Sequence, residues 1–184
     1  MTWLLSVVLL GLAVDPASLS PTHDPALLKP SRVLSATELL VGPTRRVRSN
    51  DPRLAHLLSD GARRSRTFAE LVTRVHATDL IVYVESTHNL PPDTVGRLQL
   101  QSVVRGCRYL RVQVKSTLLR DEMIAVIGHE LRHALEVADD PAVLDDAALR
   151  ALYQRIGHPA GPNGGFDTDA AKRTGFQVRD ELAG

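Results

Sequence analysis

The sequence predicts an α+β fold in which a small mixed or antiparallel sheet of about three to four strands packs on one apolar helix. Further helices are expected on its N-terminal and C-terminal sides. Two stretches before that helix, 80–84 and 108–115, have strand patterns. The stretch 124–138 is apolar almost all round, as expected of a buried helix. Helical periodicity recurs on both sides of it, at 67–76 and 145–156.

Length and composition are those of an ordinary globular domain. The chain has 184 residues, of which 43% are hydrophobic and 23% are charged, and these values are typical of one folded domain. Its net charge of +1 at pH 7 argues against a dedicated nucleic-acid-binding surface. The single cysteine, Cys107, excludes a disulfide within this chain.

The first part of the chain has the pattern of an export signal and a linker. Residues 4–14 form an apolar run of signal-peptide length, too short to cross a bilayer. A buried N-terminal helix is the alternative, because no Lys or Arg precedes the run. Six of the 11 prolines lie between 15 and 52. We therefore expect a signal peptide at 1–15, a Pro-rich linker at 16–50, and a folded domain at 51–184. The protein would be periplasmic or secreted, with no stable membrane span after signal removal.

Helices are predicted between this linker and the sheet. The stretches 53–58 and 67–76 have helical patterns, and a short helix is expected near 35–41. At the start of the second stretch, Thr67 and Glu70 have the spacing of a capping box.

The predicted strands follow. Residues 80–84, Leu-Ile-Val-Tyr-Val, form a continuous apolar run typical of a buried strand. A second strand is expected at 95–103, followed by a turn at Gly106. Residues 108–115 alternate between apolar and polar side chains, which predicts a half-exposed antiparallel strand. Asp121 is then expected to cap the next helix.

That helix, at 124–138, carries the pattern His-Glu-x-x-His. His129 and His133 are four residues apart, so a helix places them on one face, where two neutral imidazoles can hold one Zn²⁺. Glu130 lies beside them, where a carboxylate can take a proton from a metal-bound water. Polar side chains are costly to bury in an apolar helix unless they are satisfied. We therefore predict that the two histidines bind zinc and that Glu130 is the catalytic base.

The third zinc ligand stays open between three carboxylates. Asp167 and Asp169 stand at the start of a last predicted helix, 167–182, and Asp is an acceptable zinc ligand. Either one could instead be a helix cap. Glu136 follows His133 by three residues, so it could bind the same metal or orient the imidazole. We take Asp167 as the expected ligand with Asp169 and Glu136 as its rivals, and we favour the orienting role for Glu136.

Three further side chains are candidates for stabilising an oxyanion. Tyr153 lies on the predicted helix 145–156, His158 follows that helix, and His88 lies between two predicted strands. No spacing supports any of them, and packing or loop positions explain all three.

The motif at 129–133 resembles the active-site signature of the zincin metallopeptidases. The order of elements is also similar, with strands, then the motif helix, then a C-terminal helix. The stretch 128–138, Gly-His-Glu-Leu-Arg-His-Ala-Leu-Glu-Val-Ala, is similar to small, uncharacterised, exported bacterial zincin-like proteins, and the similarity extends over 68–182. The resemblance implies a zinc-dependent hydrolase of peptide bonds that acts on a peptide or protein. An extended peptide would pair with the strand at 108–115.

Two features depart from the best-known zincin patterns. Glu136 stands where the metzincins have a glycine, and no glutamate lies between Glu136 and Glu181 to serve as a gluzincin ligand. A non-catalytic zinc-binding or degenerate zincin-like module therefore remains the alternative. The intact Glu130 favours the enzyme, because a structural zinc site has no use for a base.

Overall fold

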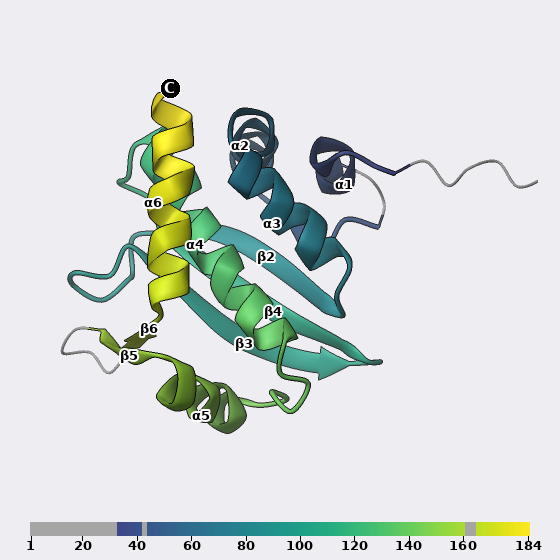
Figure 1. Ribbon diagram of the computed structural model, residues 1–184, viewed down its shortest axis with the longest axis vertical. Coiled ribbons are helices and arrows are strands. Elements are labelled where there is room, and N and C mark those ends of the chain that lie inside the picture. Colours follow the sequence, from purple (N-terminus) through teal and green to yellow (C-terminus); the bar gives the residue numbers. More distant parts are fainter. Residues whose placement is uncertain (1–32, 42–43, 161–164) are drawn as a thin grey trace, which may run out of the picture. The chain divides into compact units, whose positions relative to one another are not determined.

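The structure is a computed structural model that describes residues 33–41, 44–160 and 165–184. The predicted signal peptide at 1–15 and the first part of the predicted linker lie outside these residues. Within the unit Leu34–Gly184, the described chain is an α+β fold, as the sequence predicted, with a mixed sheet of four strands (Figure 1).

The sheet has the strand order β1-β2-β4-β3. Its strands are β1 (Val47–Arg48), β2 (Leu80–Thr87), β3 (Gly96–Val104) and β4 (Cys107–Lys115). β2 runs parallel to both β1 and β4, whereas β3 is antiparallel to β4. A two-residue turn, Arg105-Gly106, joins β3 to β4, and both residues have positive φ, at 50° and 75°, as tight hairpins require.

The prediction that the 108–115 strand would hold a peptide is wrong. That stretch is β4, which has strand neighbours on both sides, so its backbone groups are already paired. Its parallel pairing with β2 also departs from the expected antiparallel strand. Alternation along a strand reports which face is buried, not which strands lie beside it. The edge strands of the sheet are β1 and β3.

Six helices and a small hairpin complete the described part of the chain. The helices are α1 (Ala36–Val41), α2 (Pro52–Arg64), α3 (Arg66–His76), α4 (Arg120–Ala138), α5 (Asp146–Ile156) and α6 (Asp169–Ala183). The hairpin consists of β5 (His158–Ala160) and β6 (Gly165–Asp167). α4 is the motif helix, and it packs against the sheet and against α3 and α6 (Figure 1). None of the described helices is long and apolar enough to cross a membrane.

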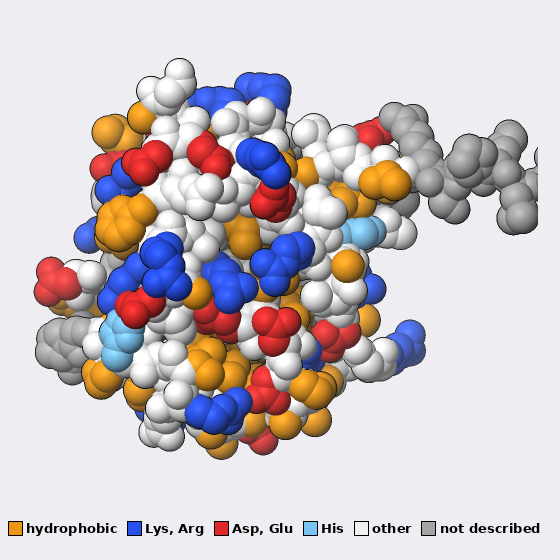
Figure 2. Space-filling view, viewed as in Figure 1, with side chains coloured by type: hydrophobic (Ala, Val, Ile, Leu, Met, Phe, Trp, Pro, Cys, Tyr) orange, Lys and Arg blue, Asp and Glu red, His pale blue; other side chains and the backbone are white. Residues whose placement is uncertain are grey.

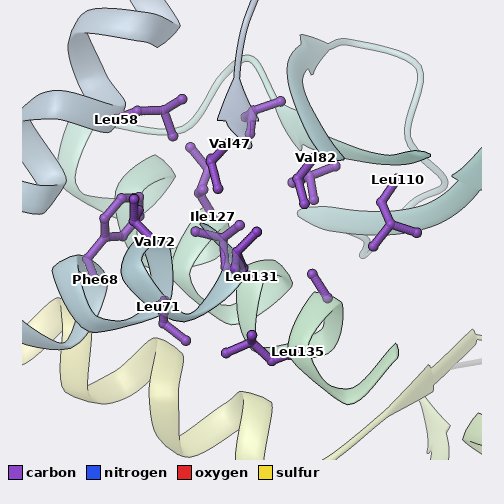
Figure 3. Close-up of a cluster of buried hydrophobic side chains, with 14 of the residues drawn as sticks. Val47, Leu58, Phe68, Leu71, Val72, Val82, Leu110, Ile127, Leu131 and Leu135 are labelled. Carbon is purple, nitrogen blue, oxygen red and sulfur yellow. The ribbon is translucent and has the colours of Figure 1, made fainter. Parts of the chain in front are cut away.

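The core lies between α4, the sheet and α3. One stripe of α4, at i, i+3, i+7 and i+11, is wholly buried, and it consists of Ile124, Ile127, Leu131 and Leu135. Figure 3 shows Ile127 and Leu131 pointing between Val72 of α3 and the sheet residues Val82 and Leu110. Because this stripe faces the core, the opposite face of α4 is turned away from it. On the face shown in Figure 2, acidic and basic side chains are interspersed.

The folded unit begins earlier than the predicted residue 51. Ala36 and Leu40 of α1 are buried, and Val47 of β1 is 2% exposed and pairs with Val82. The unit therefore starts at Leu34, and the second half of the predicted linker belongs to the domain. Frequent prolines indicated an extended chain there, but short elements between prolines still contribute apolar side chains to the core.

The cap of α3 differs from the prediction. Ser65 is the N-cap, and its hydroxyl accepts a hydrogen bond of 3.0 Å from the backbone N–H of Phe68. Thr67 instead donates to Glu181 of α6 at 2.7 Å, and Glu70 pairs with Arg66. The observed cap, Ser65, lies two residues before the predicted one, Thr67. Ser65 is at the same time the C-cap of α2.

The cap of α4 also differs from the prediction. The helix begins after Leu119, whose backbone N–H donates to the Glu122 carboxylate at 3.0 Å. Asp121 lies in the first turn, where it pairs with Arg64 of α2 at 2.7 Å. A carboxylate in the first turn still favours the positive end of the helix.

Candidate metal centre

The two motif histidines lie side by side on α4. The distance between His129 Nε2 and His133 Nε2 is 3.1 Å, and the ring centroids are 4.8 Å apart. His133 is buried and His129 is half-buried. The four-residue spacing on the helix produces this geometry, as the sequence predicted.

Asp167, the last residue of β6, approaches both rings. Its Oδ1 lies 3.3 Å from His129 Nε2 and 3.4 Å from His133 Nε2. Burial alone would raise the pKa of the Asp167 carboxyl, but hydrogen bonds with His129 and His133 outweigh it and hold that pKa well below its usual range. The carboxylate is therefore ionised and available as a ligand.

The three atoms form a nearly equilateral triangle whose sides are 3.1, 3.3 and 3.4 Å. Zinc bonds of about 2.0–2.1 Å in tetrahedral geometry place neighbouring ligand atoms about 3.3 Å apart. His129, His133 and Asp167 could thus hold a metal ion. The two nitrogens and one carboxylate oxygen also suit zinc chemically.

Glu136 lies on the other side of His133. Its Oε2 is 2.8 Å from His133 Nδ1, whereas the nitrogen that faces His129 and Asp167 is Nε2. Burial would lower the pKa of His133, but its hydrogen bonds with Asp167 and Glu136 outweigh it and raise that pKa to about 9. Glu136 thus occupies the position of a group that orients a ligand and fixes its tautomer, as the favoured interpretation expected.

Thr168 completes this arrangement, and the sequence interpretation missed it. Its buried hydroxyl donates to Glu136 Oε1 at 2.8 Å. The Thr168 hydroxyl oxygen also accepts a hydrogen bond from the backbone N–H of Ala171, so Thr168 is the N-cap of α6. Its position just before the last predicted helix was the available signal. One side chain therefore links the start of α6 to the group that holds His133.

Asp169, the other rival, lies away from the histidines. Its side chain is 73% exposed, and its closest imidazole is that of His158, at 3.8 Å. Of these two aspartates, only Asp167 reaches the histidine pair.

Glu130 is buried beside the edge strand. A Cβ added at Gly96 of β3 would lie only 2.5 Å from Glu130 Oε1, so the absence of a side chain at Gly96 lets the carboxylate approach the β3 backbone. Burial raises the pKa of the Glu130 carboxyl, and the nearby His133 and His129 offset only part of that effect. A carboxyl with a raised pKa is a better proton acceptor, as general-base chemistry requires.

Tyr153 lies in a packing position, which the sequence analysis had favoured over a role as oxyanion donor. Its hydroxyl donates to the backbone carbonyl of His133 at 3.1 Å, and its ring packs edge-on against the imidazole at 5.2 Å. Burial raises the pKa of the Tyr153 hydroxyl further above its usual value. Tyr153 therefore supports His133 from α5. His88 lies apart from these residues and contacts Ser116 at 2.8 Å.

The β5–β6 hairpin carries Asp167 to the site. His158 and Asp167 are cross-strand partners in this hairpin. At its start, a Cβ on Gly157 would lie 2.8 Å from the Asp167 carbonyl oxygen, so the close approach of the two strands needs a glycine. The sequence analysis did not predict this hairpin.

The site opens into a cleft of about 800 Å³. The cleft runs between the edge strand β3, the histidine face of α4, and a wall built from α5, the hairpin and α6. Its apolar lining includes Val95, Leu149, Phe166 and Phe176. The metal-ligand candidates and Glu130 are thus reachable from solvent.

Comparisons with known proteins give no further information, because no family model, curated protein or solved structure matches this chain.

Proposed function

We propose that this protein is a zinc-dependent hydrolase of peptide bonds with a zincin-like fold. The observation that supports this proposal most strongly is a triangle of possible metal-ligand atoms, 3.1–3.4 Å apart, from His129, His133 and Asp167. Glu130 lines the same cleft. Three protein ligands leave one coordination position for water or substrate, which is the pattern of a catalytic rather than a structural zinc site. When bound, zinc would polarise the scissile carbonyl and acidify the attacking water.

In this proposal, Glu130 transfers the proton from the attacking water to the leaving amine. As the water oxygen bonds to the carbonyl carbon, Glu130 accepts a proton from that water, and the carbonyl π electrons move onto the oxygen. When the C–N bond breaks, its electrons go to nitrogen, and Glu130 returns the proton to the leaving amine. The raised pKa of the buried carboxyl suits it to both transfers.

The free edge of β3 is the proposed binding surface for the substrate backbone. β3 pairs only with β4, and its residues 96–99 line the cleft. An extended peptide could add to this edge as a further strand, with main-chain hydrogen bonds that are independent of side chains. Gly96 would bring that strand close to Glu130. A peptide or an unfolded protein segment is thus the proposed substrate, and nucleic acid is not.

Export is part of the proposal, and it rests on the apolar run at 4–14.

Zinc content and peptide cleavage test the proposal. We expect purified protein to hold one zinc ion and His129→Ala to lose it. A peptide library should be cut by the parent protein and left intact by Glu130→Gln, which keeps its zinc. Protein that takes up no zinc under supplementation would contradict the metal centre. Zinc binding without cleavage of any peptide would favour the non-catalytic binding module.

A further inference from the structure

We propose that Lys172 of α6 is a catalytic residue that stabilises negative charge on a ligand beside the metal. In the reaction, that ligand is the oxygen of the substrate carbonyl after water has added. The inference rests on the proposed metal centre, and it assigns to the site an electrophilic group that the His-Glu-x-x-His motif does not contain.

Lys172 is positioned by the hairpin and the start of α6. It lies one turn into the helix, with its backbone N–H bonded to the Thr168 carbonyl at 3.1 Å. Its Nζ is 2.8 Å from His158 Nε2 and 3.9 Å from Asp167 Oδ2. Because His158 and Asp167 are cross-strand partners, the hairpin presents both to the same ammonium group.

The ammonium group keeps donors available for a ligand. A lysine has three N–H donors, and the contact with His158 uses one. The separation of 3.9 Å from Asp167 Oδ2 is too long for a hydrogen bond. Lys172 lines the cleft and is 43% exposed, so its remaining donors can reach a molecule bound there.

The other cations of the cleft lining are less well placed. Within the described residues, Lys172 provides the only Lys or Arg nitrogen within 4.0 Å of the Asp167 carboxylate. Arg97 donates to Gln113 on the neighbouring strand at 2.6 Å. Arg150 and Arg179 are exposed, and neither contacts the triangle of ligand atoms.

The balance of the addition step shows what Lys172 contributes. The new C–O bond sends the carbonyl π pair onto oxygen, and the proton released by water goes to Glu130. The former carbonyl oxygen then carries a full negative charge and has no proton. Lys172 donates a hydrogen bond to this charge and stays protonated throughout, because the proton that reaches the amine comes from Glu130.

A cation at this position affects metal and anion binding in opposite directions. A positive charge repels a divalent metal ion and attracts an anion bound beside that ion. Replacing Lys172 by a neutral residue should therefore leave metal affinity unchanged or improve it, while weakening anion binding. A purely structural lysine would lower both, because its loss would loosen Asp167.

The test uses the cobalt-substituted protein, whose visible spectrum reports binding of a fourth ligand. Azide and neutral imidazole are titrated into the parent, Lys172→Met, Lys172→Arg and the matched control Arg173→Met, which removes a neighbouring exposed cation. For Lys172→Met we expect azide affinity to fall about tenfold and imidazole affinity to change less than about twofold. Lys172→Arg should retain most of the azide affinity, and Arg173→Met should match the parent.

The outcomes separate this inference from the proposed function. If cobalt and zinc fail to bind the parent, the metal centre itself is wrong. If metal binds and azide affinity is the same in the parent and Lys172→Met, the role of Lys172 is overturned while the metal centre stands. Equal weakening of azide, imidazole and cobalt in a folded Lys172→Met protein would likewise overturn it in favour of a structural lysine.

Discussion

Replacing Glu136 by glutamine should weaken zinc binding without abolishing it. Glu136 uses its two oxygens on different partners, His133 Nδ1 and the Thr168 hydroxyl, both at 2.8 Å. A glutamine has only one acceptor oxygen. One of the two buried donors therefore loses its acceptor in Glu136→Gln, and the bond that remains is no longer assisted by charge.

The expected loss follows from that contact. Removing the group that orients a metal-binding histidine typically costs about 10–100-fold in affinity, which is about 1.4–2.8 kcal/mol. The upper part of this range applies here, because the side chains of His133 and Glu136 are each only 6% exposed and water cannot replace the carboxylate. Thr168→Val removes the hydrogen bond to Glu136 and the N-cap of α6 but leaves the Glu136–His133 contact in place, so its loss of zinc affinity should lie near the lower end.

The assay is competition for zinc with a chromophoric chelator at pH 7, with folding checked by circular dichroism. Asp169→Asn is the matched control, because it neutralises a nearby carboxylate that is 73% exposed and should bind zinc like the parent. If Glu136→Gln binds zinc as tightly as the parent, the orienting role is refuted. If it loses zinc as completely as His133→Ala, Glu136 is itself a ligand and Asp167 is misassigned.

Three further predictions concern the frame around the site. Gly96→Ala would place a Cβ 2.5 Å from Glu130 Oε1. We therefore expect peptide cleavage to fall at least tenfold, and thermal unfolding to show a loss of stability of about 1–3 kcal/mol. Gly184→Ala is the control and should match the parent, because a Cβ at Gly184 meets nothing within 4 Å. Arg108→Met removes a buried guanidinium that donates to three carbonyls at the end of α4. Urea unfolding should show that the free energy of unfolding falls by about 3–5 kcal/mol. A fall of less than about 1 kcal/mol would contradict this role. The hydrogen bond from Arg108 lowers the pKa of Asp79 below 3.8, so its stabilisation is present above that pH and is lost as the pH falls through the folded-state value. Asp79→Asn should therefore be about 1 kcal/mol less stable than the parent at pH 7, a deficit that shrinks in acid, whereas a constant deficit would disprove the linkage.

The parts of the fold that were predictable are those with a local periodicity. The apolar stripe of α4 and the alternation of β4 each determine a buried face directly, and both faces are buried in the structure. Strand neighbours depend instead on how distant segments meet. β4 therefore looked like an edge strand that could bind a peptide, although β2 and β3 cover both of its edges.

The candidate site, too, was predictable only where residues are close in the sequence. His129 and His133 lie together because one helix turn determines their distance. Asp167 belongs to a hairpin that begins 25 residues after His133, counting from His158, and chain spacing could not separate it from Asp169. The distances in the folded chain distinguish them, since Asp167 lies near both histidines and Asp169 does not. Lys172 has no signal in the sequence, because its position depends on the hairpin.

The most direct test of the metal centre is a crystal structure of the zinc-loaded protein with anomalous diffraction at the zinc edge. We predict one strong peak within about 2.2 Å of His129 Nε2, His133 Nε2 and Asp167 Oδ1, with its fourth position facing the cleft. A peak elsewhere, or one that Glu136 or a fourth protein side chain ligates, would contradict the account of an open catalytic zinc site.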